Sequence, residues 1–172
     1  KSPRMRVLFL FVLLSNLAFA QSDEPTVPGT LQKNSLSFNV GTALLANGGG
    51  IKYERLIPKK SVYYILSAGA HLFRFDFFTT ENHTVLSISN GLITGLDKRN
   101  HFEASIGLGW DNVNKEASGG IYGSGGSAAS QYSQFIPVAN MGYRFQAPNK
   151  DFVFRTGIGF PELIYVGLGV AF

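Results

Sequence analysis

The 172-residue chain contains no cysteine, and this absence removes several kinds of chemistry at once. It excludes a disulfide framework, a cysteine-ligated zinc site, a cysteine nucleophile and a lipid-modified cysteine anchor. Histidine is scarce as well, with only His71, His83 and His101 in the whole chain. Three scattered histidines make a poor metal site, so we expect neither a metal ion nor a cofactor.

Charge is also sparse. Only 15% of the residues are charged, against about 25% in a typical soluble domain. The hydrophobic share of 45% is too high for a disordered chain. A chain of this composition has enough apolar residues to build a core, but few charged residues to cover a fully hydrated surface.

The basic excess comes from one end of the chain. The formal net charge is +4, but Lys1, Arg4 and Arg6 are the only charged residues among the first 20. The remaining 152 residues hold 12 basic and 11 acidic side chains. This near balance removes the main support for a nucleic-acid partner.

Long apolar runs are missing too, because no segment reaches 18 consecutive apolar residues. The longest clear run, at positions 7–14, follows the basic start and precedes the small-residue site Ala18-Phe19-Ala20. This three-part pattern predicts a cleaved secretory signal peptide at 1–20, with Met5 as the expected true start. Residues 21–33 include Pro25, Pro28 and Gly29, and they predict a flexible lead-in.

The rest of the chain alternates with a period of two, which is typical of β-strands. In the last segment Ile164, Val166, Leu168, Val170 and Phe172 share one face. Tyr165, Gly167, Gly169 and Ala171 share the other face. Eight such segments are expected, near 36–43, 51–55, 64–72, 86–96, 102–111, 139–145, 152–160 and 164–172. At 73–78 the pattern fits an inverted register, which suggests a bulge or an excursion above a membrane.

Glycine decides which face of these strands is outside. The strand glycines 41, 69, 91, 95, 107, 109, 142, 157, 159, 167 and 169 all fall opposite the bulky apolar residues. A soluble sheet gains nothing from glycine on its outer face. A narrow membrane barrel needs small residues inside, where they leave room for long side chains. We therefore predict an all-β fold, an eight-stranded antiparallel up-and-down transmembrane β-barrel at 34–172.

Connector lengths orient this barrel. The connectors at 58–61, 97–100 and 147–150 are short and polar, whereas the one at 112–130 is long and rich in glycine and serine. Outer-membrane barrels have short periplasmic turns and longer external loops, so both termini are expected in the periplasm. Aromatic belts are expected at both rims of the barrel. The periplasmic rim is expected to hold Phe102, Phe145, Phe152 and Phe172, and the external rim Trp110, Phe160 and Phe78.

These features resemble the small outer-membrane β-barrel proteins of Gram-negative bacteria. The resemblance rests on the leader, the eight alternating segments, Met141-Gly142-Tyr143-Arg144-Phe145 and the ending Tyr165-Val166-Gly167-Leu168-Gly169-Val170-Ala171-Phe172. It implies that Leu168, Val170 and Phe172 form the sorting signal read by the barrel-assembly machinery. It also implies an outer-membrane location and contact with membrane lipid and lipopolysaccharide, and we expect a monomer.

Charged residues on the inward face are the main candidates for a site. They are Lys52, Glu54, His71, Glu103, Asp111, Arg144 and Arg155. Because an eight-stranded barrel is filled by its own side chains, we interpret them as a charge-balanced lumen network. The alternative is a polar passage, which makes the protein a small channel or a transporter for apolar solutes.

Catalysis is the less favoured alternative, although some eight-stranded outer-membrane barrels remove acyl chains from lipid A. A serine hydrolase needs a base beside a serine, oriented by a third group. Here His71 near Ser67 and facing Glu103 is the best candidate set. Because a lone inward histidine is usually a hydrogen-bonded filler, we assign no catalytic residue and predict that the chain is not an enzyme. The glycine-rich stretch at 119–126 lacks the Gly-Lys-Ser/Thr ending of a phosphate-binding loop.

The predicted function is therefore a structural or surface-interaction role in the outer membrane, with loops displayed outside, above all the connector at 112–130. A soluble exported barrel of the lipocalin kind is the alternative that lacks a membrane.

Overall fold

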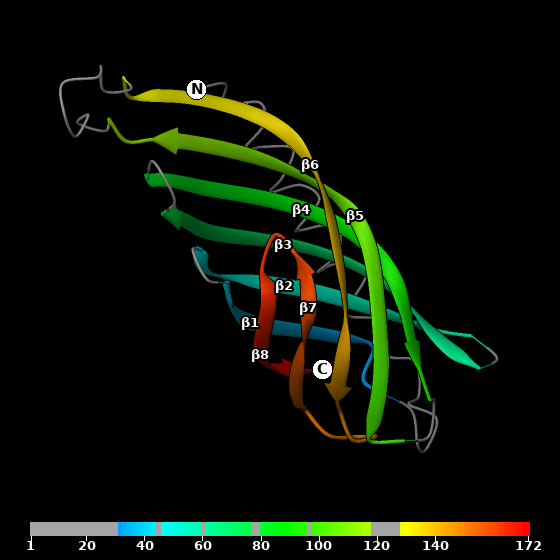
Figure 1. Ribbon diagram of the computed structural model, residues 1–172. Coiled ribbons are helices and arrows are strands. Elements are labelled where there is room, and N and C mark those ends of the chain that lie inside the picture. The colour runs from blue at the N-terminus through cyan, green and yellow to red at the C-terminus, as the bar shows by residue number, and fades with distance from the viewer. Residues whose placement is uncertain (1–30, 44–45, 60, 77–79, 96–97, 118–127) are drawn as a thin grey trace.

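The computed structural model describes residues 31–43, 46–59, 61–76, 80–95, 98–117 and 128–172. The predicted signal peptide and most of the predicted lead-in lie outside these residues. Within them, the chain forms a closed barrel of eight antiparallel strands in which each strand pairs with its sequence neighbours (Figure 1). The predicted fold is confirmed. No helix in the described part of the chain is long and apolar enough to cross a membrane.

The strands lengthen along the chain from β1 to β6, and the last two are short. They are β1 (Asn34–Ala43), β2 (Ala46–Pro58), β3 (Val62–Asp76), β4 (Thr80–Thr94), β5 (Asn100–Lys115), β6 (Ser130–Phe145), β7 (Phe152–Phe160) and β8 (Leu163–Ala171). The four strands β3–β6 have 15 or 16 residues each, whereas β7 and β8 have 9. This inequality shapes one end of the molecule.

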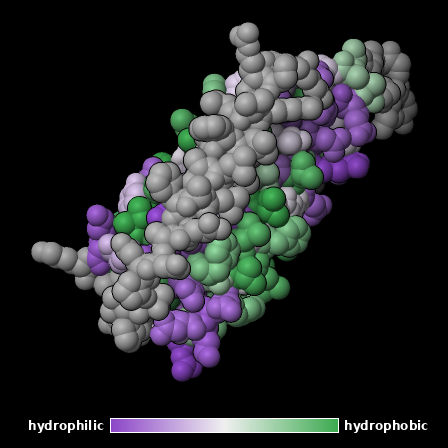
Figure 2. Space-filling view, turned by 180° about the vertical axis from the view of Figure 1, so that it is seen from behind, coloured by the Kyte–Doolittle hydropathy of each residue, from purple (hydrophilic) through white to green (hydrophobic). Residues whose placement is uncertain are grey.

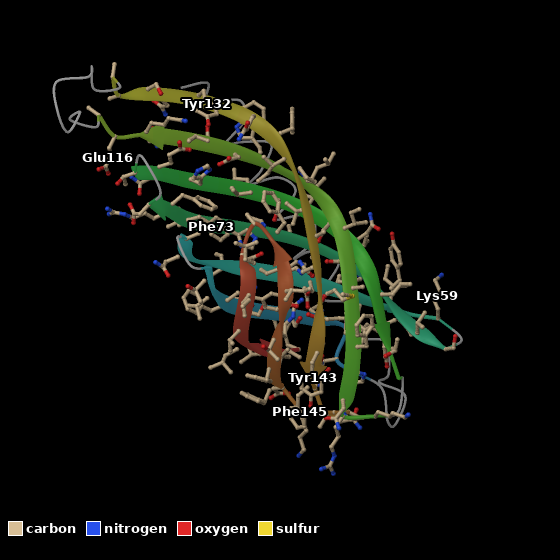
Figure 3. All side chains as sticks on the ribbon, viewed as in Figure 1. Lys59, Phe73, Glu116, Tyr132, Tyr143 and Phe145 are labelled. Carbon is tan, nitrogen blue, oxygen red and sulfur yellow. The ribbon has the colours of Figure 1, made fainter. Side chains whose placement is uncertain are left out.

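Strands β1 and β8 close the barrel beside both ends of the described chain. Asn34 N donates to Phe172 O at 3.0 Å, and Phe172 N donates to Asn34 O at 2.8 Å. The β2–β3, β4–β5 and β6–β7 turns lie at this same end, called the terminal end below. Figure 3 shows Lys59 and Phe145 there, with Glu116 and Tyr132 at the opposite, far end.

The outer surface around the barrel is apolar, as the alternation predicts. Exposed large side chains on this face include Leu36, Ile88, Leu108, Met141 and Leu168. Figure 2 shows hydrophobic residues across the middle of one face and hydrophilic residues toward its two ends. Exposed leucine and isoleucine over a whole barrel wall are stable in hydrocarbon rather than in water, so this surface is the lipid-facing side.

Strands β3–β6 continue past the barrel at the far end, while the β7–β8 hairpin stops partway along them (Figure 1). Strand β6 pairs with β5 over its whole length, but it pairs with β7 only from Ala139 to Phe145. Within the described part of the chain, residues 130–138 of β6 therefore have no strand neighbour on the β7 side. We call the part of β3–β6 beyond the hairpin the protruding sheet.

The outer face of the protruding sheet becomes polar just beyond Leu72, Leu86, Trp110 and Phe135. The outward positions that follow on the four strands are Arg74, Asp76, Asn82, Thr84, Asn112, Asn114, Gln131 and Ser133. Several of them bond to one another, as Ser133 does to Asn112 at 2.8 Å. A polar outer face marks the level at which the sheet leaves the lipid and enters water.

This change of environment decides between the two explanations offered for 73–78: through Asp76 the strand has no bulge and continues above the level of the lipid. Strand β3 stays in register with β4 through Asp76, with Phe73 opposite His83 and Asp76 opposite Thr80. The alternation is unbroken; Phe73 is still inward and Arg74 is still outward. Only the polarity of the faces inverts, because outward side chains meet water here rather than lipid. Phe77 and Phe78 lie outside the described residues.

Two further details differ from the sequence prediction. Strand β5 continues to Lys115 and β6 begins at Ser130, so the long connector is shorter than the predicted 112–130. Gly95 is not an inward strand glycine, since it lies in the turn after β4 with φ of +78°. Glycine adopts this left-handed conformation without steric cost, which explains its presence in a tight turn.

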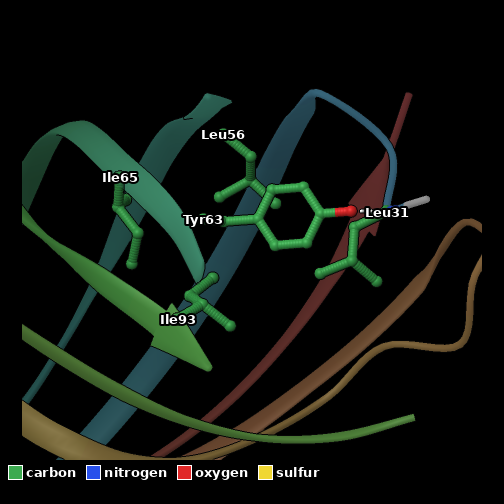
Figure 4. Packing of buried hydrophobic residues seen from close by; sticks show 5 residues of the cluster. All are labelled: Leu31, Leu56, Tyr63, Ile65 and Ile93. Atoms are coloured by element: carbon green, nitrogen blue, oxygen red, sulfur yellow. Dashed lines mark hydrogen bonds between the residues drawn. The ribbon is translucent and has the colours of Figure 1, made fainter. Parts of the chain in front are cut away.

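An apolar cluster closes the lumen at the terminal end. It consists of Leu31, Leu56, Tyr63, Ile65 and Ile93, all nearly inaccessible to solvent (Figure 4). The backbone N–H of Leu31 donates to the Tyr63 hydroxyl at 2.9 Å, and this bond fixes the segment that precedes β1. His101 lies close by on β5, where its ring contacts the carbonyl oxygens of Thr94 and Gln146.

Candidate functional site

Five of the seven predicted inward charges meet in the middle of the lumen. Arg155 on β7 contacts Glu103 on β5 through Nε at 2.7 Å and through Nη2 at 2.5 Å. Arg144 on β6 donates to Glu54 on β2, and Lys52 Nζ lies 3.2 Å from the same carboxylate. An ion pair between Arg155 Nη1 and Glu54 Oε1, 3.0 Å apart, joins the two groups. We call these five residues the lumen network.

Neutral side chains add hydrogen bonds to this network, although Lys52 Nζ, Glu54 Oε1 and Arg155 Nη1 make ion pairs without a well-aligned hydrogen bond among the described residues. Gln146 Oε1 accepts from both Nε and Nη2 of Arg144, at 2.9 and 2.7 Å. The Tyr165 hydroxyl donates to Glu103 at 3.1 Å, and Ser35 Oγ lies 3.2 Å from both Glu54 and Arg144. Glu54 and Arg144 are fully buried. Buried charges are stable only when paired and hydrogen-bonded in this way, so the arrangement can bind the strands together.

His71, the sixth predicted residue, lies outside the network, between it and the far end of the barrel. The structure does not place it beside Ser67 or Glu103. Its Nε2 lies 3.3 Å from Ser87 Oγ, and its Nδ1 lies 2.8 Å from Glu162 Oε1. Ser67 instead bonds to Ser89 at 2.6 Å. The predicted candidate set of Ser67, His71 and Glu103 is therefore wrong.

Glu162 reaches His71 because the β7–β8 turn folds toward the lumen. Both Pro161 and Glu162 of this turn are buried. Gly41 on β1 leaves the space, since a Cβ there would lie 2.7 Å from the Cβ of Glu162. The contact of Glu162 Oε1 with His71 Nδ1 connects the hairpin tip to β3.

Ser87, His71 and Glu162 follow the order of a nucleophile, a base and an orienting acid. Other requirements of acyl transfer are missing among the described residues. The Nδ1 atom of His71 makes no well-aligned hydrogen bond in the described structure. Ser87 is 7% exposed, and the ring of Phe73 stacks against His71 with the centroids 5.9 Å apart. The cavity nearest this level is not lined by Ser87. The arrangement can hold the hairpin tip, but it presents no nucleophile to a substrate.

Asp111, the seventh predicted residue, lies still closer to the far end, at the base of the protruding sheet. His83 Nδ1 donates to Asp111 Oδ2 at 2.9 Å, and Gln134 Nε2 donates to the same oxygen at 3.3 Å. The other oxygen, Oδ1, is buried without a hydrogen-bond partner in the described part of the chain. Next to this group, Lys115 forms an ion pair with Glu81 at 2.6 Å. The predicted seven residues thus occupy three separate levels of the interior.

Sequence reasoning missed several of these partners. Ser35 and Gln146 have the same parity as neighbouring inward residues, so extending the alternation by two positions could have found them. Glu162 had no such signal, because no periodic pattern predicts that a turn residue folds inward. His83 and Gln134 were missed because their inward face belongs to the part of the sheet outside the lipid.

The predicted sorting residues Leu168, Val170 and Phe172 all point outward on β8 and are exposed. Their role in assembly stays a prediction. Among the described residues, no group of histidine, aspartate and glutamate side chains is arranged to hold a metal ion.

No protein-family model and no curated protein matches the chain. Its fold is similar to that of Ail, the attachment invasion locus protein of Yersinia pestis. The TM-score is 0.54 with 14% identity, covering 85% of this chain and 100% of Ail. A structure of Ail in complex with the heparin analogue sucrose octasulfate gives a TM-score of 0.53 at 14% identity, covering 83% of this chain and 99% of Ail.

The N-terminal β-barrel domain of Pseudomonas aeruginosa OprF is similar as well, with a TM-score of 0.51 and 14% identity. The alignment covers 83% of this chain and 99% of that domain. Identity this low shows the fold alone. The chain therefore has the fold of the small eight-stranded outer-membrane β-barrels.

Proposed function

We propose that this protein is a surface-interaction protein of the bacterial outer membrane, and that its protruding sheet carries the interaction. The observation that carries this proposal is the unequal length of the strands. The barrel below is filled by charged side chains in ion pairs, whereas β3–β6 extend past the lipid-facing surface with a polar outer face. Among the described residues, the part that reaches furthest into water is a hydrogen-bonded sheet, a suitable binding platform.

The free edge of β6 defines the kind of partner. Gln146 N, at an even position, donates to Arg99 O on the chain segment that leads into β5. Successive residues of a strand direct their N–H groups to alternate sides, so the odd positions of β6 face away from β5. Gln131, Ser133 and Phe135 therefore have no strand partner for their backbone groups on that side. An extended segment of another protein can add to this edge as a further strand.

Pro137 fits this arrangement. It is an odd position of β6, so its missing N–H faces the free edge and costs no bond to β5. Proline on an edge strand limits uncontrolled pairing. Here it restricts the edge that can pair with another strand to the residues of β6 that precede Pro137.

The charge of the far end separates this proposal from the binding of sulfated sugars that the Ail complex suggests. Its charged residues are Arg74 and Lys115 against Asp76, Glu81, Asp111 and Glu116. An excess of acidic side chains repels a polyanion. We therefore propose a protein segment as the partner, rather than a sulfated polysaccharide.

Two single variants test the proposal. Ser133→Pro removes one N–H from the free edge, and Pro137 shows that β6 tolerates proline at this parity. Ser133→Ala is the control, because it removes the same hydroxyl but keeps the N–H. Cells that display the Pro variant should adhere less to surfaces coated with serum or matrix proteins than cells with the Ala variant. Equal adhesion by the two would contradict the proposal.

The absence of cysteine allows a direct test of orientation. Ser133→Cys and Lys150→Cys each introduce a unique thiol, at the far end and at the terminal end. A membrane-impermeant maleimide added to intact cells should label the first and not the second. Labelling of only the second would place the protruding sheet in the periplasm and remove the proposed function.

A further inference from the structure

A small cavity of about 100 Å³ lies at the base of the protruding sheet, beside the β7–β8 turn. Its walls include the aromatic side chains of Phe73 and Phe75 from β3 and of Phe160 at the end of β7, with aliphatic side chains between them. This volume is more than a single water needs. Gln134 and Ile136, which also line it, belong to the part of β6 without a β7 neighbour, so a gap in the barrel wall borders the cavity.

The cavity has one strongly polar feature. Asp111 lines it and is buried, with Oδ2 held by His83 and Gln134 and with Oδ1 left without a partner among the described residues. The His83 ring contacts a second carboxylate as well, since its Nε2 lies 3.6 Å from Glu81 Oε2. An ionised carboxylate with a free buried oxygen is unfavourable unless a cation or a donor approaches it.

The aromatic walls are fixed before any ligand arrives. Phe73 stacks on His71, which the ion pair with Glu162 holds in place. Phe75 makes an edge contact with His83, with the ring centroids 5.0 Å apart. Walls that are already ordered reduce the entropy cost of binding.

We propose that this cavity binds a small organic ammonium ion, with Asp111 as its counter-charge and the phenylalanine rings around it. A cation over aromatic faces beside a carboxylate is a favourable arrangement. The donor count favours a methylated ammonium over a primary one. A primary ammonium has three N–H groups to satisfy, whereas the described wall offers one free buried acceptor. A quaternary ammonium needs no acceptor and presents methyl groups to the apolar wall.

Calorimetric titration of the chain in maltoside micelles, whose head groups carry no ammonium, tests this. Choline chloride should bind saturably with one site per chain. Its neutral isostere 3,3-dimethylbutan-1-ol has the same shape without the charge, and it should bind about tenfold more weakly or not at all.

Substitutions assign the site. Asp111→Asn should weaken choline binding about tenfold or more, since it removes the counter-charge. Asp76→Asn is the control, because Asp76 lies on the outer face of the same sheet and pairs with Arg74; it should leave the affinity unchanged. Phe75→Leu keeps the charge and should also weaken binding, so the test does not depend on the folding of one variant.

Nanodiscs distinguish a lipid head group from a free ligand. If bilayer head groups reach the cavity, choline should titrate in phosphatidylglycerol discs but not in phosphatidylcholine discs. If the ligand is free in solution, both discs should give the same affinity, and either result keeps the site. Absence of saturable binding, equal binding of the neutral isostere, or an unchanged affinity in Asp111→Asn would overturn the proposal.

Discussion

Arg155 and Glu103 are joined through both Nε and Nη2 of the guanidinium, and they lie fully inside the barrel wall. Removing either partner leaves a buried charge, at a cost of about 3–5 kcal/mol. We expect Arg155→Ala and Glu103→Ala each to lower the free energy of unfolding by this amount. The double variant should cost clearly less than their sum, because the second change removes the stranded charge. Urea refolding midpoints measure all three.

A control cycle uses Glu103 and Asp111, which lie eight residues apart on β5, roughly 26 Å along the strand. Their effects should add, since no described contact joins them. Additive, small shifts in the Arg155–Glu103 cycle would favour a water-filled passage over a structural network.

Ser87 provides the second prediction at the scale of single residues. Because it is buried and no described cavity reaches it, a fluorophosphonate probe should not label the refolded chain. Labelling that disappears in Ser87→Ala would show a reactive serine and would restore the hydrolase alternative. His71→Gln should lower the free energy of unfolding, because it releases the hairpin tip that Glu162 attaches to β3.

At the scale of the strand, one β5 face passes from lipid into water within a few residues. Leu108 is 59% exposed on the lipid-facing wall, and Asn114 lies on the same face beyond Trp110. Leu108→Arg should cost about 2–4 kcal/mol in refolding from urea into lipid vesicles. Asn114→Arg should change stability by less than about 0.5 kcal/mol. Equal costs at the two positions would mean that the assigned membrane level is wrong.

The last strand carries a prediction that separates folding from assembly. Phe172 pairs with Asn34 through its backbone, and its ring points outward. Phe172→Ala keeps the backbone bonds, so refolding in detergent should hardly change. If the ring is part of a sorting signal, the amount of protein in the outer membrane of cells should fall. An unchanged cellular level would reject the signal role.

Strands were the most predictable elements of this chain, because their two faces meet different environments. Lipid outside and a narrow lumen inside impose strict alternation, so the facing of Leu168, Glu103 and Arg144 follows from parity alone. Where the sheet passes from lipid into water, the polarity of its two faces inverts. Alternation therefore indicates an inverted register at Phe73, although the strand continues unbroken. Pairing across the lumen was less predictable, because parity gives the face of a residue but not its partner. His71 could be placed inside, but not beside Glu162.

At the scale of the whole molecule, the two ends of the lumen are built differently. Leu31, Leu56, Tyr63 and Ile93 close the terminal end, and the lumen network fills the middle. The far end is open on one side, because β7 and β8 stop short of β6. The molecule is therefore organised as a closed anchor that carries a protruding sheet, with a small, largely apolar cavity beside Asp111 at the junction of the two parts.

This organisation predicts that the barrel does not conduct. An ion that crosses it must pass the buried apolar side chains of the cluster at the terminal end, and must then separate Arg155 from Glu54 and Glu103. Planar bilayers containing the refolded chain should stay at the baseline current. Maleimide labelling of Ser133→Cys in the same membranes serves as the control for insertion. Stable current steps from inserted, labelled protein would favour the channel alternative. In that case, the steps should change in Arg155→Ala, whose side chain lies in the middle of the lumen.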